Sequence, residues 1–157
     1  MVGGFVGIGL IALGIFKYRD RKLILIGVTA LMFTVVVYGS IFLYVNSVQF
    51  RKDVSPMSQQ METSLISKIE FYKSQKGQYP ETLEQLWAFD NFAEINDPIM
   101  HVSHGPNGSK YYYTRIGDKY TLFSAGVDMT PITADDIFPL MKDLDTSKIG
   151  YIREIQH

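Results

Sequence analysis

The sequence predicts an α+β protein with N-terminal transmembrane helices, followed by an amphipathic helix packed on a small antiparallel sheet. Three observations indicate this: uncharged stretches near the N-terminus, an apolar repeat of helical period after residue 55, and two aromatic-rich runs around a Gly-Asp pair. At 157 residues the chain is long enough for one soluble domain. We divide it into two membrane helices with a basic loop at 17–22 (residues 1–46) and a domain (residues 47–157).

Charge is unevenly spread between these two parts. Residues 1–46 carry a net charge of +3, and residues 47–157 carry −4, although the whole chain has a net charge of only −1. The domain has no stripe of Lys and Arg to neutralise phosphates, so we expect no nucleic-acid partner. Its aromatic content argues against disorder, and the absence of Cys excludes disulfides and thiolate metal sites.

Residues 23–45 contain no charge. As a helix they would span roughly 34 Å, enough to cross a hydrocarbon core of about 30 Å. A domain of 111 residues could hardly cover such a helix on all sides, which argues against a buried soluble helix. We therefore expect a membrane span, with Tyr38 and Tyr44 at its far interface.

Residues 1–16 are also uncharged and contain several glycines. A secretory signal peptide is an alternative, but there is no basic segment before the apolar run and no small-x-small cleavage site before Lys17. We favour a short first transmembrane helix whose glycines pack closely on the second. The loop at 17–22 holds four basic residues, which places it in the cytoplasm and both termini outside. In a Gram-negative cell this predicts an inner-membrane protein with a periplasmic domain.

An amphipathic helix is expected to begin at Ser55, as N-cap, and Pro56, as first helical residue, and to end near Gly77. Its apolar stripe recurs at helical spacing: Met57, Met61, Leu65, Ile69 and Tyr72. We place Glu62 on its flank. A short helix follows, with Thr82 and Gln85 as a capping box and Leu83, Leu86 and Trp87 as its apolar face.

Residues 110–125 give the strongest β-strand signal. Two aromatic and β-branched runs flank Gly117 and Asp118, which predicts an antiparallel hairpin with a two-residue turn. In that register Tyr113 faces Leu122, Tyr111 faces Ser124, Arg115 faces Tyr120, and Tyr112 shares the opposite face with Phe123.

No arrangement of residues recommends an enzyme. His101 and His104 form the one close histidine pair, and no third metal ligand is evident nearby, so a surface loop is the simpler interpretation. No Ser or Thr lies in a nucleophile elbow.

Three carboxylates stand close together after the second strand. Asp128, Asp135 and Asp136 could converge with backbone carbonyls on one calcium ion, which takes six to eight oxygen ligands. The alternative is that Asp128 caps a turn and Asp135 and Asp136 cap a following helix. Spacing alone favours the alternative.

Several short motifs occur in a fixed order between residues 55 and 138. They are Tyr79-Pro80-x-Thr82-Leu83-x-x-Leu86, then Asp97-Pro98, then Tyr111-x-Tyr113, and finally Tyr120-x-Leu122-x-Ser124-x-Gly126-x-Asp128 with Asp135-Asp136. In this order they resemble the major pseudopilin of type II secretion, a relative of type IV pilins. The resemblance implies a pilin-like helix-on-sheet fold with a calcium loop, in which Asp128, Asp135 and Asp136 are the calcium ligands.

The N-terminal part departs from that family, whose members have a short basic leader and a Glu five residues after the cleavage site. Here Gly4 and Phe5 resemble the site, but Gly9 stands where Glu is expected. We therefore expect Met1 to Gly4 to be retained, or at most Met1 to be lost.

We expect a non-enzymatic, structural or accessory component of a secretion or pilus-like system, with other pseudopilins or inner-membrane proteins as partners. The alternative is a stand-alone, membrane-tethered binding or sensor module with a pilin-like fold.

Overall fold

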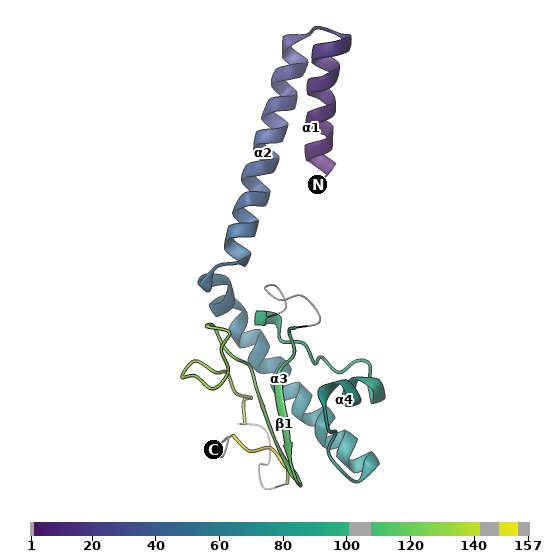
Figure 1. The fold of residues 1–157 in the computed structure, drawn as a ribbon, viewed down its shortest axis with the longest axis vertical. Coiled ribbons are helices and arrows are strands. Elements are labelled where there is room, and N and C mark those ends of the chain that lie inside the picture. Colours follow the sequence, from purple (N-terminus) through teal and green to yellow (C-terminus); the bar gives the residue numbers. More distant parts are fainter. Residues whose placement is uncertain (1, 101–107, 142–147, 154–157) are drawn as a thin grey trace. The chain divides into compact units, whose positions relative to one another are not determined.

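The computed structural model describes residues 2–100, 108–141 and 148–153. The chain forms two compact units, Met1–Asn46 and Ser47–His157, and each is described by itself. The predicted α+β architecture is confirmed, with long N-terminal helices and a two-stranded antiparallel sheet (Figure 1). His101 and His104 lie outside the described residues.

The first unit is a helical hairpin. Helix α1 (Val2–Ala12) continues into one π-helical turn, η1 (Leu13–Lys17), and helix α2 (Arg21–Val45) returns alongside α1 (Figure 1). The reversal uses Arg19 at a positive φ of 48°. Asp20 caps α2, because its side chain accepts a hydrogen bond from the backbone N–H of Lys22 at 2.8 Å. The charged residues at 17–22 therefore form a tight connection between the two apolar helices.

Glycines allow α1 and α2 to approach closely, as their positions in the sequence predict. A Cβ atom on Gly27 would lie 2.8 Å from the carbonyl oxygen of Gly7, and one on Gly14 would lie 2.7 Å from Cγ1 of Ile24. No larger side chain fits at such distances without moving a helix. Among the described residues, α2 is the one helix long and apolar enough to cross a membrane, and the α1 segment is shorter.

The second unit is built on helix α3 (Val48–Lys76), which begins earlier than its sequence suggests. The predicted start at Ser55 and Pro56 was wrong. Ser47 is the N-cap, with its hydroxyl accepting from the N–H of Phe50 at 3.2 Å, and Pro56 lies within the helix. The Ser55 hydroxyl instead donates to the carbonyl of Arg51 at 2.8 Å, one turn earlier. The C-terminus is at Gly77, as predicted, with φ of 77°.

The buried face of α3 differs from the predicted apolar stripe in the first half of the helix. Met57 is 50% exposed, whereas Ser58 and Glu62 are fully buried. From Leu65 onward the prediction holds, since Leu65 and Ile69 lie in the core. The buried stripe therefore begins with two polar residues, Ser58 and Glu62. Ser58 is buried because its hydroxyl donates a hydrogen bond to Asp97.

A short helix and a hairpin cover this face. Helix α4 (Leu83–Phe89) begins at Thr82, whose hydroxyl accepts from the N–H of Gln85 at 3.4 Å, as predicted. Leu83 and Leu86 are buried, but Trp87 is 52% exposed and was wrongly assigned to the apolar face. A helix of seven residues has only two turns to bury, so its third apolar side chain faces water.

Strands β1 (Tyr112–Ile116) and β2 (Lys119–Phe123) pair in the predicted register, with Tyr113 opposite Leu122 and Arg115 opposite Tyr120. Tyr112 and Phe123 stack with ring centroids 5.2 Å apart. Gly117 has the positive φ, 63°, that the tight turn requires.

The C-terminal segment adds a contact that the sequence patterns did not predict. The backbone N–H of Tyr120 donates to the carbonyl of Gly150 at 2.9 Å, and the backbone N–H of Ile152 donates to the carbonyl of Tyr120 at 2.9 Å. Glu70 on α3 lies beside this point and accepts hydrogen bonds from Tyr79, Tyr120 and the N–H of Gly150 at 2.9 to 3.1 Å. The carboxylate thereby ties helix, hairpin and C-terminal segment together.

Candidate functional site

The loop after β2 contains the three predicted calcium ligands, and its ends are tied together. Ser124 and Ile137 exchange two backbone hydrogen bonds of 3.0 Å, so the residues between them form a closed loop. Gly126 starts the loop with φ of 65°, and a Cβ atom there would lie 2.1 Å from the carbonyl oxygen of Asp135. Only glycine fits at this close approach, which brings the two sides of the loop together.

Each aspartate accepts a hydrogen bond from the loop backbone. Asp128 accepts from Thr130 at 2.8 Å, Asp135 accepts from Asp128 at 2.9 Å, and Asp136 accepts from Ile132 at 2.9 Å. These bonds match the alternative interpretation in part, since Asp128 does cap a turn. The helix that Asp135 and Asp136 would cap does not occur among the described residues, where bends and turns follow instead.

Asp136 differs from the other two. Its Oδ1 atom is buried, and no described residue provides a hydrogen-bond partner for it. Burial raises the pKa of Asp136 above its usual value, despite hydrogen bonds from the backbone of Thr133 and Ile132, and the charges of Asp135 and Asp128 add to the rise. The negative charges of Asp135 and Asp128 therefore act on Asp136. Of the three carboxylates, that of Asp136 is the least well compensated by hydrogen bonds.

The donor chemistry of this loop fits a hard divalent cation. It offers carboxylate oxygens, a concentration of negative charge, and one buried oxygen without a partner. Among the residues that the structure describes, however, no three His, Cys, Asp or Glu side chains converge closely enough to hold a metal ion. To bind an ion, the aspartates would have to give up the hydrogen bonds that they accept from loop N–H groups. The fit is therefore one of donor type and charge, in a loop that is not a preformed cage.

A buried polar cluster in the same unit was missed from the sequence. Asp97 is fully buried, and its Oδ1 accepts from the Ser58 hydroxyl at 3.0 Å and from the N–H of Ile99 at 2.9 Å. Its Oδ2 accepts from the Ser124 hydroxyl, at the start of the loop. Tyr111 donates to the carbonyl of Ser58 at 3.2 Å. Asp97 thus joins α3, the segment before β1 and the end of β2.

Glu62 lies beside this cluster on α3. The side chain is fully buried, and within residues 2–100, 108–141 and 148–153 neither carboxylate oxygen has a hydrogen-bond partner. Burial, and then the negative charge of Asp97, raises the pKa of Glu62 to about 9, although the backbone N–H of Ser124 lowers it, and the charge of Asp136 contributes a further rise. The hydroxyl of Tyr151 is buried and has no hydrogen-bond partner in the part of the chain that the structure describes, and burial together with the charge of Glu62 raises its pKa to about 12. The signal in the sequence was that Ser58, Glu62 and Leu65 stand at positions i, i+4 and i+7, which lie on one face of a helix.

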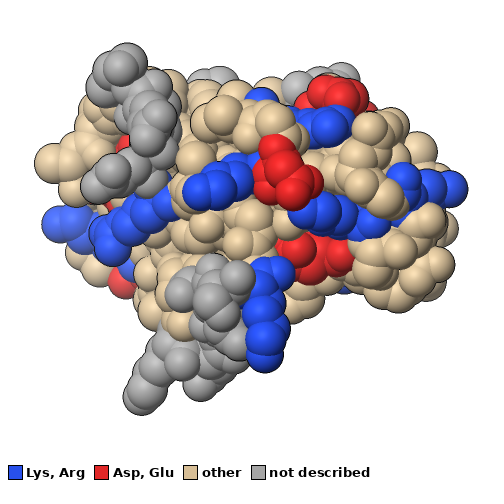
Figure 2. All heavy atoms as spheres, turned by 90° about the horizontal axis from the view of Figure 1, so that it is seen from below, with Lys and Arg blue, Asp and Glu red and all other residues tan. Residues whose placement is uncertain are grey.

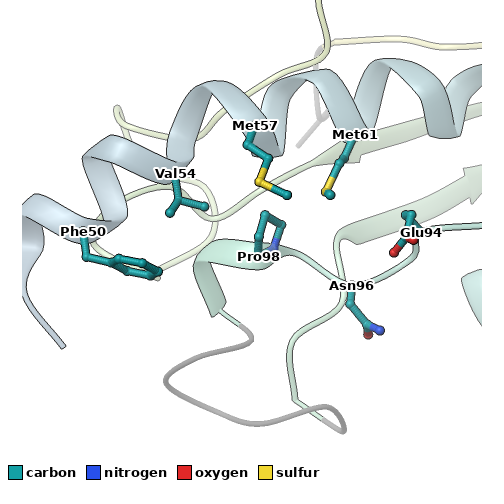
Figure 3. Close-up of a pocket in the computed structure, with 7 residues that line it drawn as sticks. All are labelled: Phe50, Val54, Met57, Met61, Glu94, Asn96 and Pro98. Atoms are coloured by element: carbon teal, nitrogen blue, oxygen red, sulfur yellow. The ribbon is translucent and has the colours of Figure 1, made fainter. Parts of the chain in front are cut away.

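An apolar groove runs along the first half of α3 (Figure 3). Phe50, Val54, Met57 and Met61 line it from the helix, and Pro98 faces them, with Glu94 and Asn96 at one end. Its volume is about 350 Å³. Apart from Glu94 its lining carries no charge, so it is a surface for contact and not for chemistry.

Charged side chains on the face seen in Figure 2 alternate in sign. Four ion pairs occur among the described residues of the second unit: Lys73 with Asp118 and Lys68 with Asp90, both at 2.6 Å, and also Arg115 with Glu81 and Lys110 with Glu84. No continuous basic surface is visible on that face.

Comparison with known protein families gives a match over more than half of the chain. The family model described as type II secretion system (T2SS), protein G, matches residues 49–139. The match extends from the first turn of α3 to just beyond Asp136, and so includes the hairpin and the aspartate loop. No curated protein and no solved structure matches the chain.

Proposed function

Because the chain belongs to the protein G family of the type II secretion system, the major pseudopilins, we propose that it is a membrane-anchored structural or accessory component of such a system. The single observation that carries the proposal is the family match across α3, the hairpin and the aspartate loop. The family is structural and not catalytic, and we assign no reaction to the chain. Its expected partners are other components of the secretion system.

The direct test is deletion of the gene in its own cell. We expect proteins that normally leave the cell to accumulate inside, and a plasmid copy of the full chain to restore their export. Export that continues at the normal level in the deletion strain would contradict a required role in secretion. It would favour the alternative function, a stand-alone binding module, to which the apolar groove on α3 would be suited.

Anchoring through α2 is part of the proposal. This helix has 25 residues, and its large apolar side chains are exposed, for example Phe33 at 70% and Leu43 at 72%. Such a surface is stable in lipid and costly in water. With the basic segment 17–22 in the cytoplasm, the domain would lie in the periplasm of a Gram-negative cell. A reporter active only in the periplasm, fused after His157, should be active, and activity of a cytoplasm-only reporter there would reverse the topology.

We further propose that the loop binds calcium through Asp128, Asp135 and Asp136. Charge repulsion among them supports the proposal, since a cation would relieve it. An ion that binds only the folded state stabilises it by about 2.7 kcal/mol at a hundredfold excess over Kd. That stabilisation raises the melting temperature by roughly 4–8 °C per kcal/mol for a small domain.

Melting the full chain in detergent with calcium, magnesium or chelator tests this. Calcium should stabilise much more than magnesium, which demands a tighter octahedron and loses its waters reluctantly. Asp128→Ala should abolish the difference between calcium and chelator. Equal melting temperatures of the wild type in calcium and chelator would leave the aspartates as turn caps only.

A further inference from the structure

Three phenylalanine side chains form an exposed apolar surface near the C-terminal end of α3. Phe71 is 56% exposed, Phe89 is 37% exposed and Phe92 is 80% exposed. The rings of Phe71 and Phe89 contact each other, with centroids 6.1 Å apart. Phe92 follows in the turn at Asp90, whose carboxylate accepts from the N–H of Phe92 at 3.0 Å. We call these three phenylalanines the phenylalanine end. A group of exposed aromatic side chains is typical of a contact surface.

The phenylalanine end and the apolar groove described above lie on one side of α3. Met57, Ser64 and Phe71 are spaced seven residues apart, which places their side chains on the same face of the helix. The segment after α4 follows this face. Phe89 contacts Phe71 at one end of it. Pro98 faces Met57 across the groove at the other end (Figure 3). One partner can therefore cover both surfaces at once.

The charges beside the two surfaces are opposite in sign. At the phenylalanine end, the Nζ atom of Lys76 lies 5.3 Å from the centroid of the Phe89 ring. Lys68 is paired there with Asp90 at 2.6 Å, so the ion pair adds no net charge to that of Lys76. The charged residue that lines the groove is the acidic Glu94. A phenylalanine end placed on a groove thus brings opposite charges together.

A second copy of this chain supplies both surfaces. A lipid surface is the poorer fit, because interfacial binding draws on an excess of basic residues, and residues 47–157 carry a net charge of −4. The groove, about 350 Å³ in volume, has room for an aromatic side chain. Shape and charge therefore favour another copy of the chain as the occupant.

The available area favours a contact that is made twice. At roughly 200 Å² for a whole phenylalanine side chain, the phenylalanine end exposes on the order of 350 Å². A stable contact buries about 800 Å² on each partner. One phenylalanine end on one groove supplies less than half of this area. Two such contacts, in which each copy buries its phenylalanine end and its groove, supply roughly 700 Å² per copy.

We propose that two copies of the chain associate about a twofold axis near Ser64, with the phenylalanine end of each copy against the groove of the other. Ser64 lies midway between Met57 and Phe71, so the two α3 helices run antiparallel and Phe71 of each copy meets Met57 of the other. Such a contact closes after two copies and does not propagate. The inference goes beyond the proposed function, and it depends neither on a role in secretion nor on calcium.

Cysteine crosslinking of the full chain in isolated membranes tests the axis. The chain contains no cysteine, so Ser64→Cys introduces a single thiol at an exposed position of α3. A residue meets its own copy only near a twofold axis. Under mild oxidation Ser64→Cys should therefore run as a dimer on a non-reducing gel. Thr114→Cys, at an exposed position of β1, is the control and should remain a monomer.

A second substitution tests the phenylalanine end. Phe92→Ser, added to Ser64→Cys, should reduce the crosslinked dimer about tenfold, since exposed aromatic residues dominate contacts of this kind. Trp87→Ser is the matched control, because Trp87 is an exposed aromatic residue of α4 outside the phenylalanine end, and it should leave the dimer unchanged. Urea unfolding of both variants checks that each is folded, as expected for changes at exposed side chains.

Three results would overturn the proposal. If Ser64→Cys remains a monomer, the groove has another occupant. If Ser64→Cys and Thr114→Cys crosslink equally, the contact is random collision. If Phe92→Ser leaves the dimer intact, the copies meet through another surface. Normal export in the deletion strain, together with a dimer that depends on Phe92, would refute the proposed function and leave this contact standing.

Discussion

Glu62 should make the calcium-free protein less stable as pH rises, and the size of the effect follows from its surroundings. Its ordinary pKa is 4.5, and burial followed by the charge of Asp97 raises it to about 9. The folded state therefore holds a proton that the unfolded chain releases above pH 4.5. Stability from this proton is present below the lower value and is lost as pH rises toward the higher one.

The loss is about 1.4 kcal/mol for each pH unit in this window. Between pH 5 and pH 7 it comes to roughly 2–3 kcal/mol, a large share of the 5–15 kcal/mol typical of a domain. Glu62→Gln removes the titrating group and should remove this slope. The free energies of unfolding of the two proteins should therefore diverge above pH 5, with the variant the more stable at pH 8.

Urea unfolding of the full chain in detergent and chelator, at pH 5, 7 and 8, measures this. The chain has one tryptophan, Trp87 on α4, so its fluorescence reports on the second unit alone. The burial-raised pKa values of Asp97 and Asp136 remain in both proteins and cancel in the comparison. The reasoning is refuted if wild type and Glu62→Gln lose stability equally between pH 5 and pH 8.

Three further predictions concern the packing, the polar cluster and the N-terminus. Gly27→Val should separate α1 from α2, because its Cβ would lie 2.8 Å from the backbone oxygen of Gly7, whereas Gly39→Val has open space around it and should not. Crosslinking between cysteines placed on α1 and α2 should therefore fall in the Gly27 variant and stay unchanged in the Gly39 variant. Asp97→Ala should lower the free energy of unfolding by about 2–4 kcal/mol, because it removes the buried acceptor of hydrogen bonds from the hydroxyls of Ser58 and Ser124 and from the N–H of Ile99. Asp118→Ala at the exposed turn should cost under about 1 kcal/mol in the same urea titration. Intact mass should show an uncut bond between Gly4 and Phe5, and a mature protein that begins at Phe5 would contradict this.

Local patterns in the sequence predicted the hairpin well. The alternation of residues on either side of Gly117 fixes which side chains face each other, because a slip by one residue would turn every side chain over. The end of α3 was equally readable, since glycine at positive φ is a common helix terminus.

The first residue of α3 was harder to predict, because the sequence contains two residues that could serve as its N-cap. Ser55 before Pro56 is a sound N-terminal signal, but Ser47 provides another one, and the helix extends back to it. Proline within a helix removes one hydrogen bond, a cost that the longer helix tolerates. Local propensity alone does not decide between two such caps.

The buried polar cluster around Asp97 could not be predicted, because the residues that form it are far apart in the sequence. Ser58 and Glu62 are polar, so the pattern of apolar residues assigns them to the surface. Their burial depends on Asp97, Tyr111 and Tyr151, which the fold brings to them from other elements. The aspartates of the loop were found through a family resemblance and not through spacing. The binding of calcium to them remains a prediction.

The central claim, that this chain works within a type II secretion system, is tested most directly by purifying it from its own membranes. The full chain, tagged after His157, would be crosslinked in cells, solubilised in detergent and isolated, and the proteins bound to it identified by mass spectrometry. We predict other pseudopilins and inner-membrane secretion components, and their loss when residues 47–157 are removed. Recovery of the tagged chain without any secretion component, from cells that actively secrete, would contradict the claim.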